Sequence, residues 1–309
     1  MAGLKQIKSK IRSIGKTRKV TKAMEAVSAA KMRKAQQKAL AGRSYARAAM
    51  AVLARVAGSK DLARHPLTQV RDVARATYIV VTADRGLAGA LNSAVLRAVE
   101  RDIAEAELSK VQVRIIAVGR KANDYFARRD YAIEAYHPHN AEEVSSQLMH
   151  DIVNEAAFRF AEGECDVVKI AYQHFITTFE QRPTVRTIFP LSLDELREVV
   201  DDIVPKRGLY ADEARASEDE FSSVPYTVEP SRAQVFDVVL PKLASVFVYH
   251  ALLENQASEH SARMVAMKSA TDKGAELQQA LTLQFNNARQ AAITREVSEI
   301  TGGMEAMAS

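Results

Sequence analysis

The chain has 309 residues, with 43 Lys or Arg against 38 Asp or Glu and a formal net charge of +5. Hydrophobic residues make up 47% of it and charged residues 26%, a balance that excludes wholesale disorder. We expect a soluble chain, because no run approaches the roughly 18 to 20 uninterrupted apolar residues of a membrane span. A single cysteine, Cys165, excludes a disulfide scaffold and a cysteine-based zinc site.

Charge is distributed unevenly along the chain. Residues 1–55 contain 15 Lys or Arg and one acid, Glu25, whereas residues 194–220 contain ten acids and four bases. A basic arm of this kind attracts nucleic acid, anionic lipid or an acidic protein surface, and its charge alone does not distinguish them.

The first 57 residues predict one long helix, because they lack proline and are rich in Ala, Lys, Arg, Gln, Met and Leu. Leu4, Ile7, Ile11 and Ile14 recur at steps of three and four, the seam of a coiled coil. We expect this stripe to change phase near Gly15 and to continue through Val20, Met24, Val27 and Ala30. A helix this long needs a long partner helix to cover its apolar stripe.

The other end of the chain predicts that partner. Ser231 is a candidate N-cap after Pro230, and a helical pattern runs from there to about Thr301. Its predicted seam consists of Met264, Met267, Gly274, Leu277, Leu281, Ala288 and Ala292. The two helices are expected to pack antiparallel, with the longer C-terminal one extending past the N-terminus.

The middle of the chain alternates between strand and helix patterns. Strands are predicted at 77–82, 111–118, 167–175 and 185–189, separated by helices at 90–106 and 141–161. This order predicts a small Rossmann-like α/β domain with a mostly parallel sheet. The predicted organisation is therefore a discontinuous coiled-coil shaft (1–60 and 230–309), an α/β domain (70–190) and an acidic insertion or linker (191–226).

Three short motifs suggest ligand chemistry, but each has a simpler interpretation. Gly15-Lys16-Thr17 ends like a phosphate-binding loop, yet Lys10 stands where that loop needs a glycine and no strand precedes it. Residues 84–92 follow the first strand with Gly-x-x-Gly, which lacks the third glycine of a dinucleotide fingerprint, so a tight turn is favoured. His137 and His139 flank a proline without further metal-ligand spacing, which favours an exposed loop.

Four ordered segments resemble the gamma subunit family of F-type ATP synthases. They are Lys22–Arg33, Thr82–Asn92, Tyr226–Pro230, and the C-terminal set Ala262–Asp272, Asn287–Thr294 and Glu299–Ile300. The chain departs from the family at Ala88, where cysteine is common, and at Arg295, where Gln or Asn is usual. It also lacks the redox cysteine pair of photosynthetic members, so thiol regulation of that kind is not expected.

The resemblance implies a non-catalytic rotor shaft that couples proton (or sodium) passage to ATP synthesis or hydrolysis. Its implied partners are three alpha and three beta subunits, the epsilon subunit and the membrane c-ring. It implies no catalytic, cofactor or metal site, no nucleic acid and no direct membrane span. The complex would lie at the cytoplasmic face of a bacterial inner membrane, or at the matrix face if the protein is organellar.

By family position, two groups of residues are candidate contacts. Those expected to meet the beta subunits are Lys22, Met24, Arg263, Arg289, Gln290 and Thr294. Those expected at the foot, near the rotor ring and the epsilon subunit, are Asp84, Arg85, Tyr226 and Glu229.

Two other functions compete with this interpretation. A coiled-coil protein that binds nucleic acid would use the basic arm on phosphates, with affinity that falls steeply with salt, but would leave the C-terminal segments unexplained. A dinucleotide-dependent enzyme would need the missing third glycine.

Overall fold

The computed structural model describes residues 2–56, 64–138, 146–192 and 231–308. The helices are α1 (Ala2–Val56), α3 (Leu91–Glu105), α4 (Arg120–Ala127), α5 (Ser146–Ala161) and α8 (Arg232–Ala308), with short 3-10 turns η1 (Pro66–Thr68) and η2 (Lys110–Gln112). The strands are β1 (Ala76–Val81), β2 (Val113–Val118), β3 (Ala132–His137), β4 (Val167–Phe175) and β5 (Gln181–Phe189). The predicted long terminal helices with an α/β region between them are confirmed.

The five strands form one mixed sheet in the order β3-β2-β1-β4-β5. β1 pairs in parallel with β2 and β4, β2 pairs in parallel with β3, and β5 runs antiparallel to β4. The predicted mostly parallel sheet is therefore confirmed. β3 and α4 were missed: β3 shows no clear alternation of buried and exposed residues, and α4 is only eight residues long, although Ala122 and Phe126 recur at helical spacing on its buried side.

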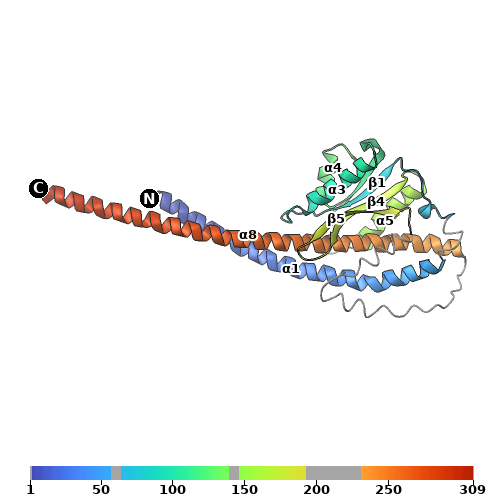
Figure 1. Cartoon of the computed structure of the whole chain (residues 1–309), viewed down its shortest axis with the longest axis horizontal. Helices are drawn as coiled ribbons and strands as arrows, with labels where there is room; N and C mark the ends of the chain where they lie inside the picture. The colour runs from blue at the N-terminus through green and yellow to red at the C-terminus, as the bar shows by residue number, and fades with distance from the viewer. Residues whose placement is uncertain (1, 57–63, 139–145, 193–230, 309) are drawn as a thin grey trace. The chain divides into compact units, whose positions relative to one another are not determined.

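Helices cover both faces of the sheet (Figure 1). α3 and α4 pack on one face, where Tyr78, Val80, Val95, Val99 and Phe126 belong to one buried cluster. α5 and the first part of α8 pack on the other, in a cluster that includes Ile79, Val81, Phe160, Leu240 and Phe247. Alternate residues of β1 thus face opposite layers, as the pleat of a strand requires.

One stretch of α8 is apolar enough to be compared with a membrane span. A window of 18 residues within Gln234–Thr301 has a mean hydropathy of 1.5, and 56% of that window is buried inside the protein. Leu240, Phe247 and Leu252 of α8 belong to the buried cluster on one face of the sheet. By length and composition alone such a helix is weak evidence for a membrane span, since core helices share these properties.

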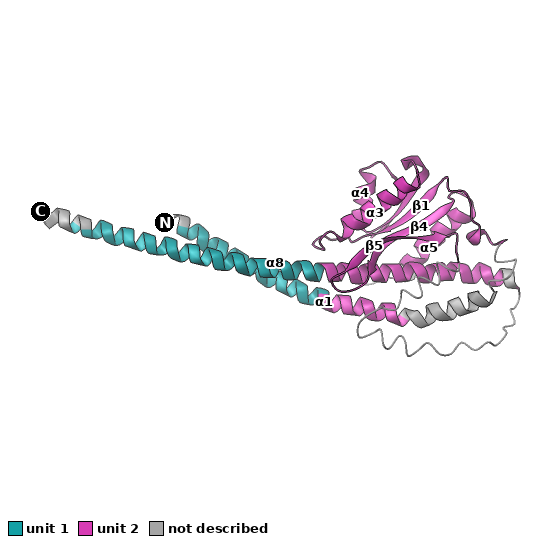
Figure 2. Cartoon of the chain, in the orientation of Figure 1, with its two compact units in different colours: residues 1–28, 263–309 teal, residues 29–262 magenta. Residues whose placement is uncertain are grey.

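The chain divides into two compact units, shown in different colours in Figure 2. Unit 1 consists of residues 1–28 and 263–309, and unit 2 of residues 29–262. Both long helices contribute to both units. The boundaries predicted from the sequence (1–60 with 230–309, 70–190 and 191–226) separate long helices from α/β structure and do not mark compact units. They stay a prediction.

Gly119 links β2 to α4 and has a backbone that only glycine adopts readily. Its φ is 94°, and a Cβ at this position would lie 2.1 Å from the carbonyl oxygen of Thr82. The Gly119 N–H donates to the carbonyl of His137 at 2.8 Å, and the Thr82 hydroxyl accepts from the N–H of Ala122 at 2.9 Å. Gly119 therefore allows the ends of β1, β2 and β3 to meet closely.

We predict that Gly119→Ala lowers the free energy of unfolding by about 3 kcal/mol, since it adds backbone strain to a steric clash. Thermal unfolding of the purified chain measures the effect. Gly86→Ala is the matched control, because no atom lies within 4 Å of the added Cβ there. Equal melting temperatures for the two variants would contradict this account of the turn.

Candidate functional site

The two ends of the chain pair as antiparallel helices in unit 1. The hydroxyls of Thr21 and Thr271 are 2.6 Å apart, and Arg18 Nη1 donates to Gln278 Oε1 at 2.9 Å. Gly274 lies against the Arg18 side chain, whose Cγ would be 3.6 Å from an added Cβ. Residue numbers rise along α1 as they fall along α8, so the predicted antiparallel pairing is confirmed.

The seam of this pair keeps a regular heptad on both helices. On α8 its half-buried or buried members are Met264, Met267, Thr271, Gly274, Gln278, Leu281, Phe285, Ala288 and Ala292. Gln278 therefore replaces Leu277, which we had predicted in the seam and which is 48% exposed.

The predicted change of phase in α1 is wrong. Val20 and Val27 are 58% and 55% exposed, and Ala30 is exposed as well. The seam instead continues in phase from Ile14 to Thr21 and Ser28, which are buried. Helical geometry, with its repeat of about 3.5 residues in a coiled coil, determines which positions face the partner even where these positions are polar. Small hydroxyl side chains fit there because Thr21 finds a hydrogen-bond partner across the seam.

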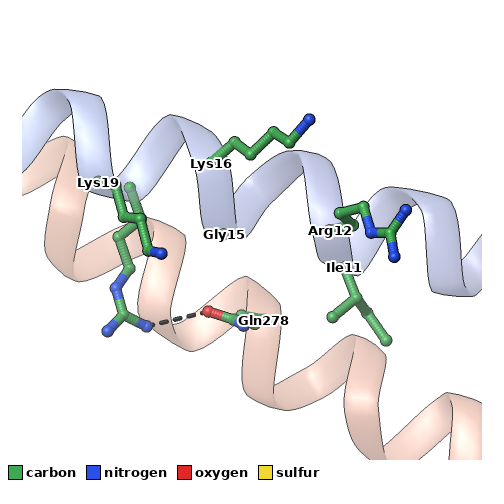
Figure 3. Close-up of a pocket in the computed structure, with 7 residues that line it drawn as sticks. Ile11, Arg12, Gly15, Lys16, Lys19 and Gln278 are labelled. Carbon is green, nitrogen blue, oxygen red and sulfur yellow. Dashed lines mark hydrogen bonds between the residues drawn. The ribbon is translucent and has the colours of Figure 1, made fainter.

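A basic groove lies beside the polar part of this seam (Figure 3). Its volume is about 610 Å³, and its lining includes the cations Arg12, Lys16, Arg18 and Lys19 and no acid. Ile11 points toward α8, whereas Lys16 points away from it (Figure 3). Gly15, Lys16 and Thr17 lie inside α1, so the structure places this tripeptide in a helix rather than in a phosphate-binding loop.

The C-terminal end of α8 continues past the beginning of α1 (Figure 2). With Thr21 opposite Thr271, the residues from about 292 onward have no counterpart in α1. Ile293, Val297, Ile300 and Met304 recur there at steps of four, three and four and are 52% to 67% exposed. This apolar stripe, which we call the tip stripe, lacks a covering helix within the part of the chain that the structure describes.

The residues expected to contact beta subunits occupy different environments. Lys22, Arg289, Gln290 and Thr294 are exposed, and Met24 is half-buried. Arg263 is only 9% exposed. Of the predicted foot residues, Asp84 is half-buried and Arg85 is exposed, while Tyr226 and Glu229 lie outside the described residues.

The Gly-x-x-Gly segment after β1 is a turn held by side chains on both sides. Asn92 Oδ1 accepts from the N–H of Ala83 at 2.9 Å, and Asp84 Oδ1 accepts from the N–H of Arg120 at 2.7 Å. Arg120 in turn donates to the carbonyl of Asp84 at 2.9 Å. These bonds stabilise a turn that presents Arg85 to solvent and links the foot candidate Asp84 to α4.

In an open α/β sheet, ligands bind beyond the carboxyl ends of the strands where the strand order reverses. That point lies here between β1 and β4. The backbone N–H of Gln173, at the end of β4, donates to Asn255 Oδ1 of α8 at 3.2 Å. A side chain of α8 thus contacts β4 near this point, and the turn after β1 lacks the third glycine of a dinucleotide fingerprint.

Two further sequence candidates have a structural role. Burial raises the pKa of the Cys165 thiol, which is 2% exposed and so stays protonated and shielded. His137 is the last residue of β3 rather than part of an exposed loop, while His139 lies outside the described residues. In the ranges described, no group of three His, Cys, Asp or Glu side chains is placed to hold a metal ion.

The buried polar part of α8 was not predicted from the sequence. Its members are Glu254, Asn255, Gln256, Ser258, Glu259, His260 and Ser261. The sequence gives no signal of this burial, because a polar run within an apolar helix is expected to face solvent. Only the packing of the sheet against α8 shows that it is buried.

Comparison with known proteins gives consistent matches along almost the entire chain. The protein family described as ATP synthase matches residues 3–307. The ATP synthase gamma chain of Pelotomaculum thermopropionicum is 40% identical over 307 residues, 99% of this chain and 100% of that protein. The ATP synthase gamma chain of Heliobacterium modesticaldum is 38% identical over 308 residues, with the same coverage of both chains.

Solved structures share the fold at lower sequence identity. A chain of the Euglena gracilis mitochondrial ATP synthase (OSCP, F1 and c-ring, rotational state 3) aligns with a TM-score of 0.65 and 20% identity, covering 99% of this chain and 95% of its own length. A chain of the Tetrahymena thermophila mitochondrial ATP synthase central stalk and c-ring aligns with a TM-score of 0.59 and 21% identity, covering 81% and 99%.

We predict that Thr21→Cys combined with Thr271→Cys forms a disulfide within one chain under mild oxidation, because the two hydroxyls are 2.6 Å apart. Val20→Cys with Thr271→Cys is the control, since Val20 is 58% exposed; its yield should be about tenfold lower. Mass spectrometry of peptides after proteolysis measures both. A higher yield of the disulfide through position 20 than through position 21 would show that Val20 lies in the seam, and would contradict the seam described above.

Proposed function

The chain belongs to the ATP synthase gamma-chain family, and on that premise we propose that it acts as the rotor shaft of an F-type ATP synthase. In this role it is a non-catalytic subunit of the central stalk. It couples ion passage through a membrane rotor to ATP synthesis or hydrolysis in other subunits.

The observation that best supports a shaft is the antiparallel pair with its uncovered tip stripe. Two helices joined by a continuous seam resist twisting better than one helix, because relative rotation would break the contacts along the seam. The tip stripe offers Ile293, Val297, Ile300 and Met304 to a surrounding apolar surface. These exposed side chains are large and apolar, which favours a close apolar sleeve.

The proposed partners are three alpha and three beta subunits around the paired helices, with the epsilon subunit and the c-ring at the foot. The relatives from Euglena and Tetrahymena are chains of complexes that contain a c-ring. The four cations of the basic groove would complement acidic segments of a surrounding ring. We accordingly propose a peripheral location, at the cytoplasmic face of a bacterial inner membrane or the matrix face of a mitochondrial one.

Within this proposal, the exposed Lys22, Arg289, Gln290 and Thr294 contact the beta subunits directly. Met24 and Arg263 are half-buried or buried, so they act at least in part by packing within the chain. Asp84, Arg85, Tyr226 and Glu229 belong to the foot. The rival function, nucleic-acid binding through the basic arm, leaves the tip stripe without a partner.

Purification of the chain from its native membrane tests the proposal. A gamma subunit should co-purify with larger nucleotide-binding chains, and the complex should pump ions when it hydrolyses ATP. A chain that instead elutes alone, and binds DNA with an affinity that falls steeply with salt, would favour the rival function.

We predict that Met24→Lys allows assembly but lowers the number of ions pumped per ATP hydrolysed. The new ammonium enters a half-buried position next to the seam, where it either disturbs the partner helix or forms a new ion pair with a beta subunit. Such a pair is worth up to about 1 kcal/mol, which corresponds to a factor of about five in an equilibrium constant. We therefore expect the number of ions pumped per ATP hydrolysed to fall two- to fivefold.

Val27→Lys is the matched control for this prediction, because Val27 lies one turn away on α1 and is 55% exposed. Proton pumping and ATP hydrolysis are measured on the same vesicles. Wild-type coupling in the Met24→Lys complex would contradict the role of this position, as would an equal loss in Val27→Lys.

A further inference from the structure

A segment of α8 in unit 2 is buried on every side although most of its residues are polar. Every residue from 251 to 261 is buried. The sheet and the β4–β5 hairpin cover one side of this segment, and α1 runs along the other (Figure 1). Polar side chains in such a place cost free energy unless they are hydrogen-bonded, so their bonding partners indicate what they do.

Asn255 and Ser258 bind the backbone of β4 on the edge that β1 no longer covers. Pairing with β1 ends at Ala171 of β4, and Gln173 lies beyond that point. The N–H of Gln173 donates to Asn255 Oδ1 at 3.2 Å, and the Ser258 hydroxyl donates to the carbonyl of Gln173 at 3.0 Å. Both backbone groups of one buried residue are thus satisfied by α8.

Two further contacts extend this attachment along the helix. The Ser261 hydroxyl donates to the carbonyl of Thr178, in the β4–β5 turn, at 2.5 Å. His174 Nδ1 lies 2.8 Å from Glu254 Oε2. Asn255, Ser258 and Ser261 are spaced by three residues and therefore lie along one side of α8.

These bonds select one axial and rotational position of α8 on the sheet. Apolar packing distinguishes a shift of one helical turn, about 5.4 Å, less sharply than hydrogen bonds do, because dispersion contacts have little directionality. The same shift would leave the N–H and the carbonyl of Gln173 buried without partners. A structural role in stability alone explains Asn255 poorly, since it is 0% exposed and its Nδ2 has no hydrogen-bond partner among the residues that the structure describes.

We propose that Asn255, Ser258 and Ser261 form a register clasp that transmits torque between the α/β sheet and α8. The inference rests on the proposed rotor function, in which force applied to the sheet has to reach α8 without slippage. The three side chains are positioning residues: they hold β4 and its hairpin at one place on the helix that continues to the tip.

The test uses the assembled, membrane-bound complex with Asn255→Leu plus Ser258→Ala, and with Ser258→Ala alone in case the double variant does not assemble. Amide hydrogen exchange of residues 172–176 reports the attachment, and ions pumped per ATP hydrolysed report torque transmission. In the double variant we expect exchange about tenfold faster and coupling reduced to about half, with smaller changes of the same sign in the single variant.

Two variants separate the clasp from a general effect on folding. Ser258→Thr retains the hydroxyl and should restore both readouts. Ser245→Ala removes another buried hydroxyl of α8, one whose bond at 2.9 Å goes to the carbonyl of Pro241 in the same helix, and should leave both unchanged.

Faster exchange at β4 with wild-type coupling would overturn the clasp, as would unchanged exchange or an equal loss of coupling in Ser245→Ala. A wild-type complex that hydrolyses ATP without pumping ions would instead contradict the proposed function. In that case the exchange measurement still decides whether Asn255 and Ser258 hold β4.

Discussion

A helix of 77 residues cannot bury its own apolar face, and covering α8 is the constraint on which the rest of the structure depends. In unit 1 the cover is the beginning of α1, and in unit 2 it is the sheet, α5 and the later part of α1. One face of the α/β sheet is therefore the packing surface for α8. Its opposite face, covered by α3 and α4, is an ordinary core.

Along α8 the buried residues change from apolar to polar, and the two groups contribute differently to the structure. Apolar residues such as Leu240 and Phe247 provide most of the burial and hence the stability. The polar segment around Asn255 contributes less net stability, because its hydrogen bonds largely offset the cost of desolvation, but it specifies geometry. The Thr21–Thr271 pair does the same for the coiled coil, since hydroxyls 2.6 Å apart exist in one register only.

Much of this architecture was predictable because it rests on local periodicity. Steps of three and four at Leu4, Ile7, Ile11 and Ile14 indicated a coiled-coil helix, and β-branched runs indicated β1, β2 and β4. The order of elements predicted a parallel sheet, and four segments indicated the family. β3 and α4 were missed because they have only six and eight residues, too few for a periodic pattern to stand out in the sequence.

The sequence by itself determined the long terminal helices, the alternating middle and the family, because each follows from spacing between near neighbours or from ordered motifs. The tertiary structure alone decided which face of each helix is buried. Val20 and Val27 looked like seam residues by their hydrophobicity, but the supercoil directs Thr21 and Ser28 inward, because position relative to the partner outweighs residue type. The same reason explains Asn255. Its polar side chain predicts an exposed position, but it lies beside the edge of β4 that β1 does not cover, where its amide oxygen accepts from the N–H of Gln173.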